Sequence, residues 1–189
     1  MNRFNFQKTI FAVALLVVFL SCQTDNKQEY SERMMHPSHK YSFVPVTSDK
    51  MGYLETDYLP VYSDIYHMDG TRRFLLTSTI SIRNTSLSDS ACIFKADYHD
   101  SHGALLRSYI DTAILIKPLE SIEFVVENKE DKGGAGANFI IEWGGKFYAD
   151  QLLIQAVMTG TSNQQGLSFT TEAKVIKRSE KQTGPGDIE

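Results

Sequence analysis

Residues 74–84 read FLLTSTISIRN, and their side chains alternate between apolar and polar positions. The even positions are mostly apolar and include Phe74 and Ile82, whereas the odd positions are mostly threonine, serine and arginine. Successive side chains of a β-strand point to opposite faces of its sheet. This stretch therefore predicts a strand with one face in a hydrophobic core and the other in water.

The same two-residue period recurs along the chain, and no window shows convincing helical spacing. Residues 139–143 and 152–158 are apolar at nearly every position, which is typical of strands in the centre of a sheet. The sequence DSHG at 100–103 has the chemistry of a tight turn and predicts a hairpin. About eight antiparallel strands at this spacing predict an all-β, immunoglobulin-like sandwich; they cover residues 58–66, 74–84, 91–99, 104–111, 121–127, 139–143, 152–158 and 167–173.

Four side chains lie on apolar faces of these strands and are expected to be buried. Ile82 and Phe124 belong to different alternating segments, and Trp143 follows the apolar residues of 139–141. Cys92 lies on the apolar set of its strand, so we expect an inert thiol and not a nucleophile, which needs an electropositive, accessible environment.

Length and charge exclude several classes of protein. A chain of 189 residues predicts one domain. A net charge of −4 and an isoelectric point near 5.7 argue against binding to nucleic acid, which needs a basic surface. Two cysteines cannot build a disulfide-rich scaffold or a cysteine-based zinc site. We expect no cofactor.

The N-terminus has the layout of a secretory signal peptide. Arg3 and Lys8 make its start basic, and residues 9–20 form an almost unbroken apolar run. The run is shorter than the roughly 20 residues that a membrane-spanning helix needs.

The end of this run, Phe19-Leu20-Ser21-Cys22, resembles a bacterial lipobox, in which the cysteine receives a diacylglycerol and becomes the new N-terminus. We therefore expect residues 1–21 to be removed as a lipoprotein signal and Cys22 to be lipidated. An ordinary secretory signal with an incidental cysteine is the alternative.

The mature chain divides into three parts. Residues 22–51 are polar and predict a tether that becomes ordered towards its end, 52–177 form the sandwich, and 178–189 predict a disordered tail. Without residues 1–21 the side chains carry 17 basic and 23 acidic groups, a net charge of −6. Anionic lipids would repel such a body, so we expect the anchor to hold it to the membrane of the bacterial cell envelope, at the outer membrane.

Several segments resemble one family of bacterial envelope lipoproteins, known as domain of unknown function 3124. The resemblance covers about residues 56–176, and its most specific piece is GGAGANF at 133–139. It implies a small lipid-anchored envelope protein and brings no catalytic residues. The other segments that carry it are LPVYSDIYH at 59–67, SIRNT at 81–85, RSY at 107–109, KPL at 117–119 and EFVVE at 123–127.

A histidine and aspartate cluster is the first candidate for chemistry. Asp97 and His99 share a strand face, a turn could return His102 towards them, and His67 could be a fourth ligand. Zinc or copper would accept such ligands. The spacing matches no established pattern, and these residue types also favour a hydrated turn, so we do not expect a metal site.

A glycine-rich segment is the second candidate. Gly133, Gly134 and Gly136, with Asn138, could cradle a carboxylate with their backbone amides. The segment lacks the ending of a phosphate-binding loop and precedes a strand, not a helix. The glycines are more typical of a tight connection or a bulge.

A row of tyrosines is the third candidate. In an extended segment 58–66, Tyr58, Tyr62 and Tyr66 point to one side, and Pro60 confines the strand to a sheet edge. Exposed tyrosines offer flat apolar area with hydroxyl groups for binding a protein or a glycan. The alternative is that a loop covers the row and buries it.

These observations lead to two hypotheses. The first is a non-enzymatic, lipid-anchored binding or assembly module that presents an edge strand and loops to a protein or glycan partner. The second is a metal-handling or hydrolytic envelope protein that uses the histidine and aspartate cluster. A sandwich fold does not decide between them, because sandwiches host many unrelated functions.

Overall fold

The computed structural model describes residues 41–130, 132–146, 151–162 and 165–180. Within these ranges the chain forms thirteen strands and one short 3-10 helix, Ser48–Lys50, and it contains no α-helix. No described helix is long and apolar enough to cross a membrane. The predicted signal, Cys22 and the tether up to residue 40 lie outside the described residues.

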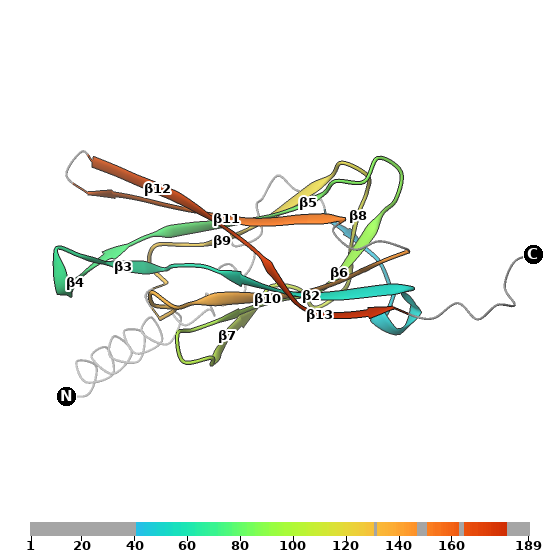
Figure 1. Cartoon of the computed structure of the whole chain (residues 1–189), viewed down its shortest axis with the longest axis horizontal. Coiled ribbons are helices and arrows are strands. Elements are labelled where there is room, and N and C mark those ends of the chain that lie inside the picture. The colour runs from blue at the N-terminus through green and yellow to red at the C-terminus, as the bar shows by residue number, and fades with distance from the viewer. Residues whose placement is uncertain (1–40, 131, 147–150, 163–164, 181–189) are drawn as a thin grey trace, which may run out of the picture. The chain divides into compact units, whose positions relative to one another are not determined.

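Two antiparallel sheets form the sandwich (Figure 1). The larger sheet has the order β1-β8-β6-β10-β2-β13, with β7 also paired to β6, and the smaller has the order β12-β11-β5-β9. This confirms the predicted all-β sandwich. The strands of the larger sheet are β1 (Ser42–Phe43), β2 (Tyr53–Pro60), β6 (Ala91–His99), β7 (Leu105–Ser108), β8 (Ile114–Ile116), β10 (Asn138–Gly145) and β13 (Lys174–Glu180). Those of the smaller are β5 (Thr77–Asn84), β9 (Ser121–Val126), β11 (Leu152–Ser162) and β12 (Gln165–Glu172).

The core lies between the two sheets, where the inward faces of their strands meet. Ile82, Phe124 and Trp143 are all fully buried there, as predicted. The rings of Tyr109 and Phe124 lie 5.3 Å apart, and those of Tyr53 and Trp143 lie 5.5 Å apart. Contacts of this kind stabilise a core beyond the area that they bury.

The hairpin predicted around residues 100–103 is present, because β6 pairs with β7 on either side of this turn. The Asp100 carboxylate accepts hydrogen bonds from the backbone N–H groups of His102 and Ala104, each over 2.8 Å. Gly103 takes a positive φ of 81°. The bonds from Ala104 and His102 lower the pKa of Asp100.

Two predicted strands are each broken in the structure. The single strand expected over 58–66 is wrong: β2 ends at Pro60, and β3 (Asp64–His67) begins a separate hairpin with β4 (Asp69–Leu75). The strand expected over 74–84 is likewise divided between β4 and β5 at Leu76. At both breaks a backbone N–H group forms a hydrogen bond outside the strand ladders. The N–H of Val61 donates to the carbonyl of Ala137 over 3.0 Å, and the N–H of Leu76 donates to the carbonyl of Ser63 over 2.8 Å.

The strands beyond the predicted eight are short or lie at the ends of the domain. β1 and the 3-10 helix fall in the last residues of the predicted tether, and β8 has only three residues. β13 is charged and mostly exposed, and it continues to Glu180, three residues past the expected end of the sandwich. The tail beyond it, 181–189, lies outside the described residues.

Candidate functional site

The three tyrosines of the predicted row lie in three different environments. Tyr58 is half-buried on the outer face of the larger sheet, opposite Ile140 and Lys174 in the neighbouring strands. Tyr62 follows β2, and its ring lies edge-on to Phe169 of β12 at 5.5 Å, packed against the core. Only Tyr66 is exposed, at 59%. The break after Pro60 therefore removes the row as a continuous surface.

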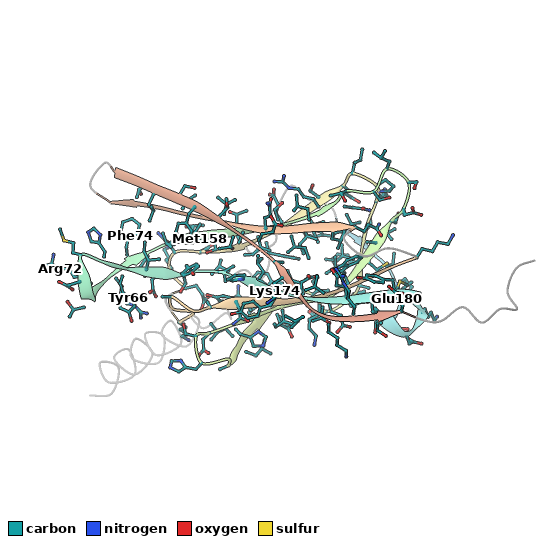
Figure 2. All side chains as sticks on the ribbon, in the orientation of Figure 1. Tyr66, Arg72, Phe74, Met158, Lys174 and Glu180 are labelled. Carbon is teal, nitrogen blue, oxygen red and sulfur yellow. The ribbon has the colours of Figure 1, made fainter. Side chains whose placement is uncertain are left out.

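Tyr66 belongs to the β3–β4 hairpin, which has two chemically different faces. Ile65 and Phe74 are paired in register and pack against the core. Tyr66 is paired with Arg73, on the opposite face, and the guanidinium of Arg73 lies 5.3 Å from the centre of the tyrosine ring. Figure 2 shows Tyr66 and Phe74 on opposite sides of the hairpin, with Arg72 at its far end.

The tip of this hairpin presents an exposed methionine. Met68 is 81% exposed and has a positive φ of 64°, which is uncommon for a residue with a side chain. Arg72 Nη1 lies 3.7 Å from its sulfur. Asp69 Oδ1 accepts hydrogen bonds from the hydroxyl and the backbone N–H of Thr71, and these bonds lower the pKa of Asp69. The tip is therefore an ordered turn that directs an apolar side chain into solvent.

An ion pair links the two strands of the hairpin, between a buried carboxylate and a half-exposed guanidinium. Asp64 is 1% exposed, and its Oδ1 lies 2.9 Å from Arg73 Nε. The same guanidinium borders the glycine loop, because a Cβ added to Gly134 would lie 3.7 Å from Arg73 Nη2. Loss of Arg73 would leave the buried Asp64 carboxylate without this partner, which is costly. Arg73 thus holds the exposed face of the hairpin in place.

The glycine loop is clamped by two serines. Gly134 donates its backbone N–H to Ser63 Oγ over 2.7 Å, and Gly136 donates to Ser101 Oγ over 2.9 Å. Ser101 also donates to the Gly133 carbonyl through both its hydroxyl and its backbone N–H. Two of the amides predicted to cradle an anion are therefore engaged within the protein. The geometry supports the structural interpretation of the loop.

The glycines of this loop fill positions where a side chain would not fit. Gly134 has a positive φ of 79°, and a Cβ there would lie 2.6 Å from Ser101 Oγ. A Cβ at Gly133 would overlap the buried hydroxyl of Tyr98. Asn138, the fourth residue of the predicted cradle, is already the first residue of β10 and is half-buried.

The histidines and aspartate of the second hypothesis are not gathered into a metal site. No group of three or more potential metal ligands occurs among the described residues. Asp97 accepts a hydrogen bond from Ser108 over 2.6 Å, and His102 is 91% exposed in the turn after β6. His67 lies in the hairpin, with its ring 6.1 Å from that of Phe74. His99 is half-buried in β6.

Comparison with known proteins assigns the chain to a family. The sequence matches "Protein of unknown function (DUF3124)" over residues 54–176. The protein belongs to the DUF3124 family. No curated protein matches the chain. A solved structure described as "Crystal Structure of Thermotoga maritima 1070" is 14% identical, with a TM-score of 0.34; the match covers 64% of this chain and 92% of that one. That similarity is too low to inform fold or function.

The DUF3124 region contains the whole β3–β4 hairpin, the glycine loop and both serines that clamp it. It also contains residues that the sequence-based hypotheses missed, above all Met68, Arg72 and Arg73. The signal was present in residues 64–75, where aspartate, glycine and threonine at 69–71 are typical of a turn between two short strands. Cys92 is buried and free, and burial raises its pKa, as expected for an inert thiol.

Proposed function

We propose that this DUF3124 protein is a lipid-anchored, non-enzymatic binding module of the bacterial cell envelope, and that its β3–β4 hairpin contacts a partner protein. Anchoring through Cys22 at the outer membrane is supported by the signal-like residues 1–21 and the lipobox-like end of that segment. The contact surface is defined here as Tyr66, Met68, Arg72, Arg73 and Leu75.

The main support for choosing this surface is the grouping of exposed apolar side chains on the hairpin. Nine large apolar side chains are exposed in the described parts of the chain, and three of them, Tyr66, Met68 and Leu75, are on this one hairpin. The other six are spread singly over other segments: Phe43, Leu87, Leu105, Leu119, Leu167 and Ile176. Single exposed apolar residues are normal, whereas a group on one projecting element indicates an interaction surface.

The composition of the surface favours a protein partner over a glycan. Tyrosine, methionine and arginine are the residue types enriched in protein interfaces. Sugars stack on aromatic faces, and Arg73 already occupies one face of the Tyr66 ring. The hairpin also stands at one end of the sandwich in Figure 1, beyond the ends of β2 and β10, where a large partner can approach it.

Site-specific photocrosslinking tests this proposal in intact cells that produce the full chain with Cys22 present. A photoreactive amino acid replaces Met68 in one variant and Leu87 in a control variant, since these residues are 81% and 83% exposed. We expect a discrete protein adduct from position 68 that is absent from position 87. Adding Tyr66→Ala and Arg72→Ala to the position-68 variant should weaken the adduct at least about fivefold.

Two outcomes would overturn the assignment. Equal adduct patterns from positions 68 and 87 would show that the hairpin contacts nothing selectively. An adduct that glycosidases remove and proteases leave intact would replace the protein partner by a glycan.

A further inference from the structure

The strand β12 (Gln165–Glu172) forms one edge of the smaller sheet. It pairs with β11 on one side, and no described strand pairs with it on the other (Figure 1). An open edge presents a row of unpaired N–H and C=O groups, which is a template for pairing with a further strand. The free side of β12 can therefore accept an extended segment of another chain.

The register of the sheet identifies the backbone groups on this open side. Ala173 donates its N–H to the carbonyl of Ile154, the residue opposite it, so these two form a hydrogen-bonded pair. Bonded and non-bonded pairs alternate along an antiparallel ladder. Counting back from Ala173 along β12, the N–H and C=O groups of Gly166, Ser168 and Thr170 point away from β11.

The other edges of the two sheets are each protected in a recognisable way. On β9 the carbonyls of Glu123 and Val125 accept hydrogen bonds from the hydroxyls of Tyr41 and Tyr109, over 2.8 and 3.2 Å. β13 has four charged side chains, and a register shift interrupts its pairing with β2. β1 and β7 have only two and four residues. Charges, irregular pairing and short length are common protections of sheet edges against other chains.

β12 has none of these protections. Its sequence is QGLSFTTE, in which Glu172 at the end is the only charged residue, and its pairing with β11 is regular. Leu167 is 39% exposed, and the half-buried ring of Phe169 packs against Tyr62. Threonine and aromatic residues favour strands. Residues 166–171 thus form an uncharged edge that is suited to pairing.

Two copies of β12 complement each other in one antiparallel register. When Ser168 lies opposite Ser168 of a second copy, the outward N–H and C=O groups of the two strands face each other. Gly166 of each copy then pairs with Thr170 of the other. On the inner face, the exposed Leu167 of each copy lies beside Phe169 of the other, and such apolar cross-strand pairs stabilise a sheet.

The charge of the edge favours a second copy as the occupant. Like charges directly opposite each other destabilise a strand pair, and identical strands bring identical charges together. The uncharged residues 166–171 avoid this repulsion. Two-fold symmetric dimers are also the commonest oligomers of soluble proteins.

We propose that β12 pairs with β12 of a second copy of this chain, across a two-fold axis at Ser168. The two smaller sheets then join into one continuous sheet. The proposal is independent of the hairpin contact surface, because none of the residues that define that surface belongs to β12.

Cysteine crosslinking in lysates of cells that produce the full chain tests the register. Ser168→Cys places a thiol at the axis, where hydrogen-bonded residues have Cα atoms about 5.5 Å apart, within the roughly 4.4–6.8 Å that disulfides span. Ser179→Cys, at an exposed position of the protected edge strand β13, is the matched control. Under mild oxidation we expect at least about fivefold more disulfide-linked dimer from Ser168→Cys than from the control or the parent chain.

Two further variants in the Ser168→Cys background test the edge itself. Thr170→Lys introduces a charge and should reduce the dimer at least about fivefold, as lysines protect natural edges. Thr170→Gln, which is similar in length and neutral, should retain the dimer. Thr170 is exposed, so the melting curves of both variants should match that of the parent chain.

Three outcomes would overturn the proposal. Equal amounts of dimer from Ser168→Cys and Ser179→Cys would show random collision, and a dimer unaffected by Thr170→Lys would show that the edge is not the contact. A disulfide adduct of Ser168→Cys with a different protein, in place of the dimer, would replace the second copy by another partner.

Discussion

Ser63 Oγ accepts a hydrogen bond from the backbone N–H of Gly134 over 2.7 Å, although the two residues are 71 positions apart. Ser63 lies in the short link between β2 and the hairpin, and Gly134 lies in the loop before β10. This bond joins the base of the proposed contact surface to the glycine loop, so a change in either residue should affect both.

Ser63→Ala should lower the free energy of unfolding by about 1–3 kcal/mol, because it leaves the buried Gly134 amide without this acceptor. Gly134→Ala should also be destabilising, since its φ of 79° disfavours a side chain and the new Cβ would press on Ser101. Urea melts measure both. Gly166→Ala is the control, as a Cβ there meets nothing within 4 Å. Loss of stability in the control alone would contradict the clamp.

Ile82→Ala and Phe124→Ala should each cost about 2–5 kcal/mol of folding stability, because both side chains are fully buried between the sheets. Leu87→Ala, at a position that is 83% exposed, should stay within about 0.5 kcal/mol. Denaturant melts compare the three. A loss below about 0.5 kcal/mol at either core position would show that the assignment of strand faces is wrong.

Truncation of Tyr62 and of Tyr66 should affect the stability of the fold to different extents. Tyr62→Ala should destabilise the fold by about 1–3 kcal/mol, because the ring packs on Phe169. Tyr66→Ala should cost less than about 1 kcal/mol, the scale of its exposed contact with Arg73. Thermal melts distinguish them, and a larger loss for Tyr66 than for Tyr62 would remove the hairpin as a free surface.

Alkaline pH should reveal the burial of Tyr98. Burial raises the pKa of Tyr98 to about 12, whereas the unfolded chain ionises near 10. The folded state then binds more protons than the unfolded state between these values, so stability falls as pH rises through that window. Tyr98→Phe should make this fall shallower in urea melts at pH ~7 and pH ~11. If stability falls equally steeply with pH in Tyr98→Phe, a group other than Tyr98 causes the fall.

Cys22→Ala should move the protein from the membrane fraction to a soluble, unlipidated form. The expectation follows from the lipobox-like residues 19–22, which lie outside the described structure. Fractionation and mass spectrometry of the mature N-terminus measure the change. If the wild type carries an unmodified N-terminus and fractionates like the variant, the protein is not a lipoprotein.

Local patterns in the sequence were sufficient to predict the sandwich, its buried positions and one of its turns. The alternation in residues 74–84 places Ile82 in the core, and DSHG at 100–103 forms the hairpin, because strand faces and tight turns depend on residues that are close in sequence. The expected strand over 58–66 failed for the opposite reason. Its break depends on bonds from Val61 to Ala137 and from Leu76 to Ser63.

Only the tertiary structure decided which residues form the proposed contact surface. Arg73 meets Tyr66 because a hairpin returns the chain. Glu55 and Arg178 are 123 positions apart, yet they form one ion pair. Sequence periodicity tells which face of a strand is apolar, but it carries no information about which distant strand lies opposite. That choice is made by packing and by hydrogen bonds between strands, which form only when the whole domain folds.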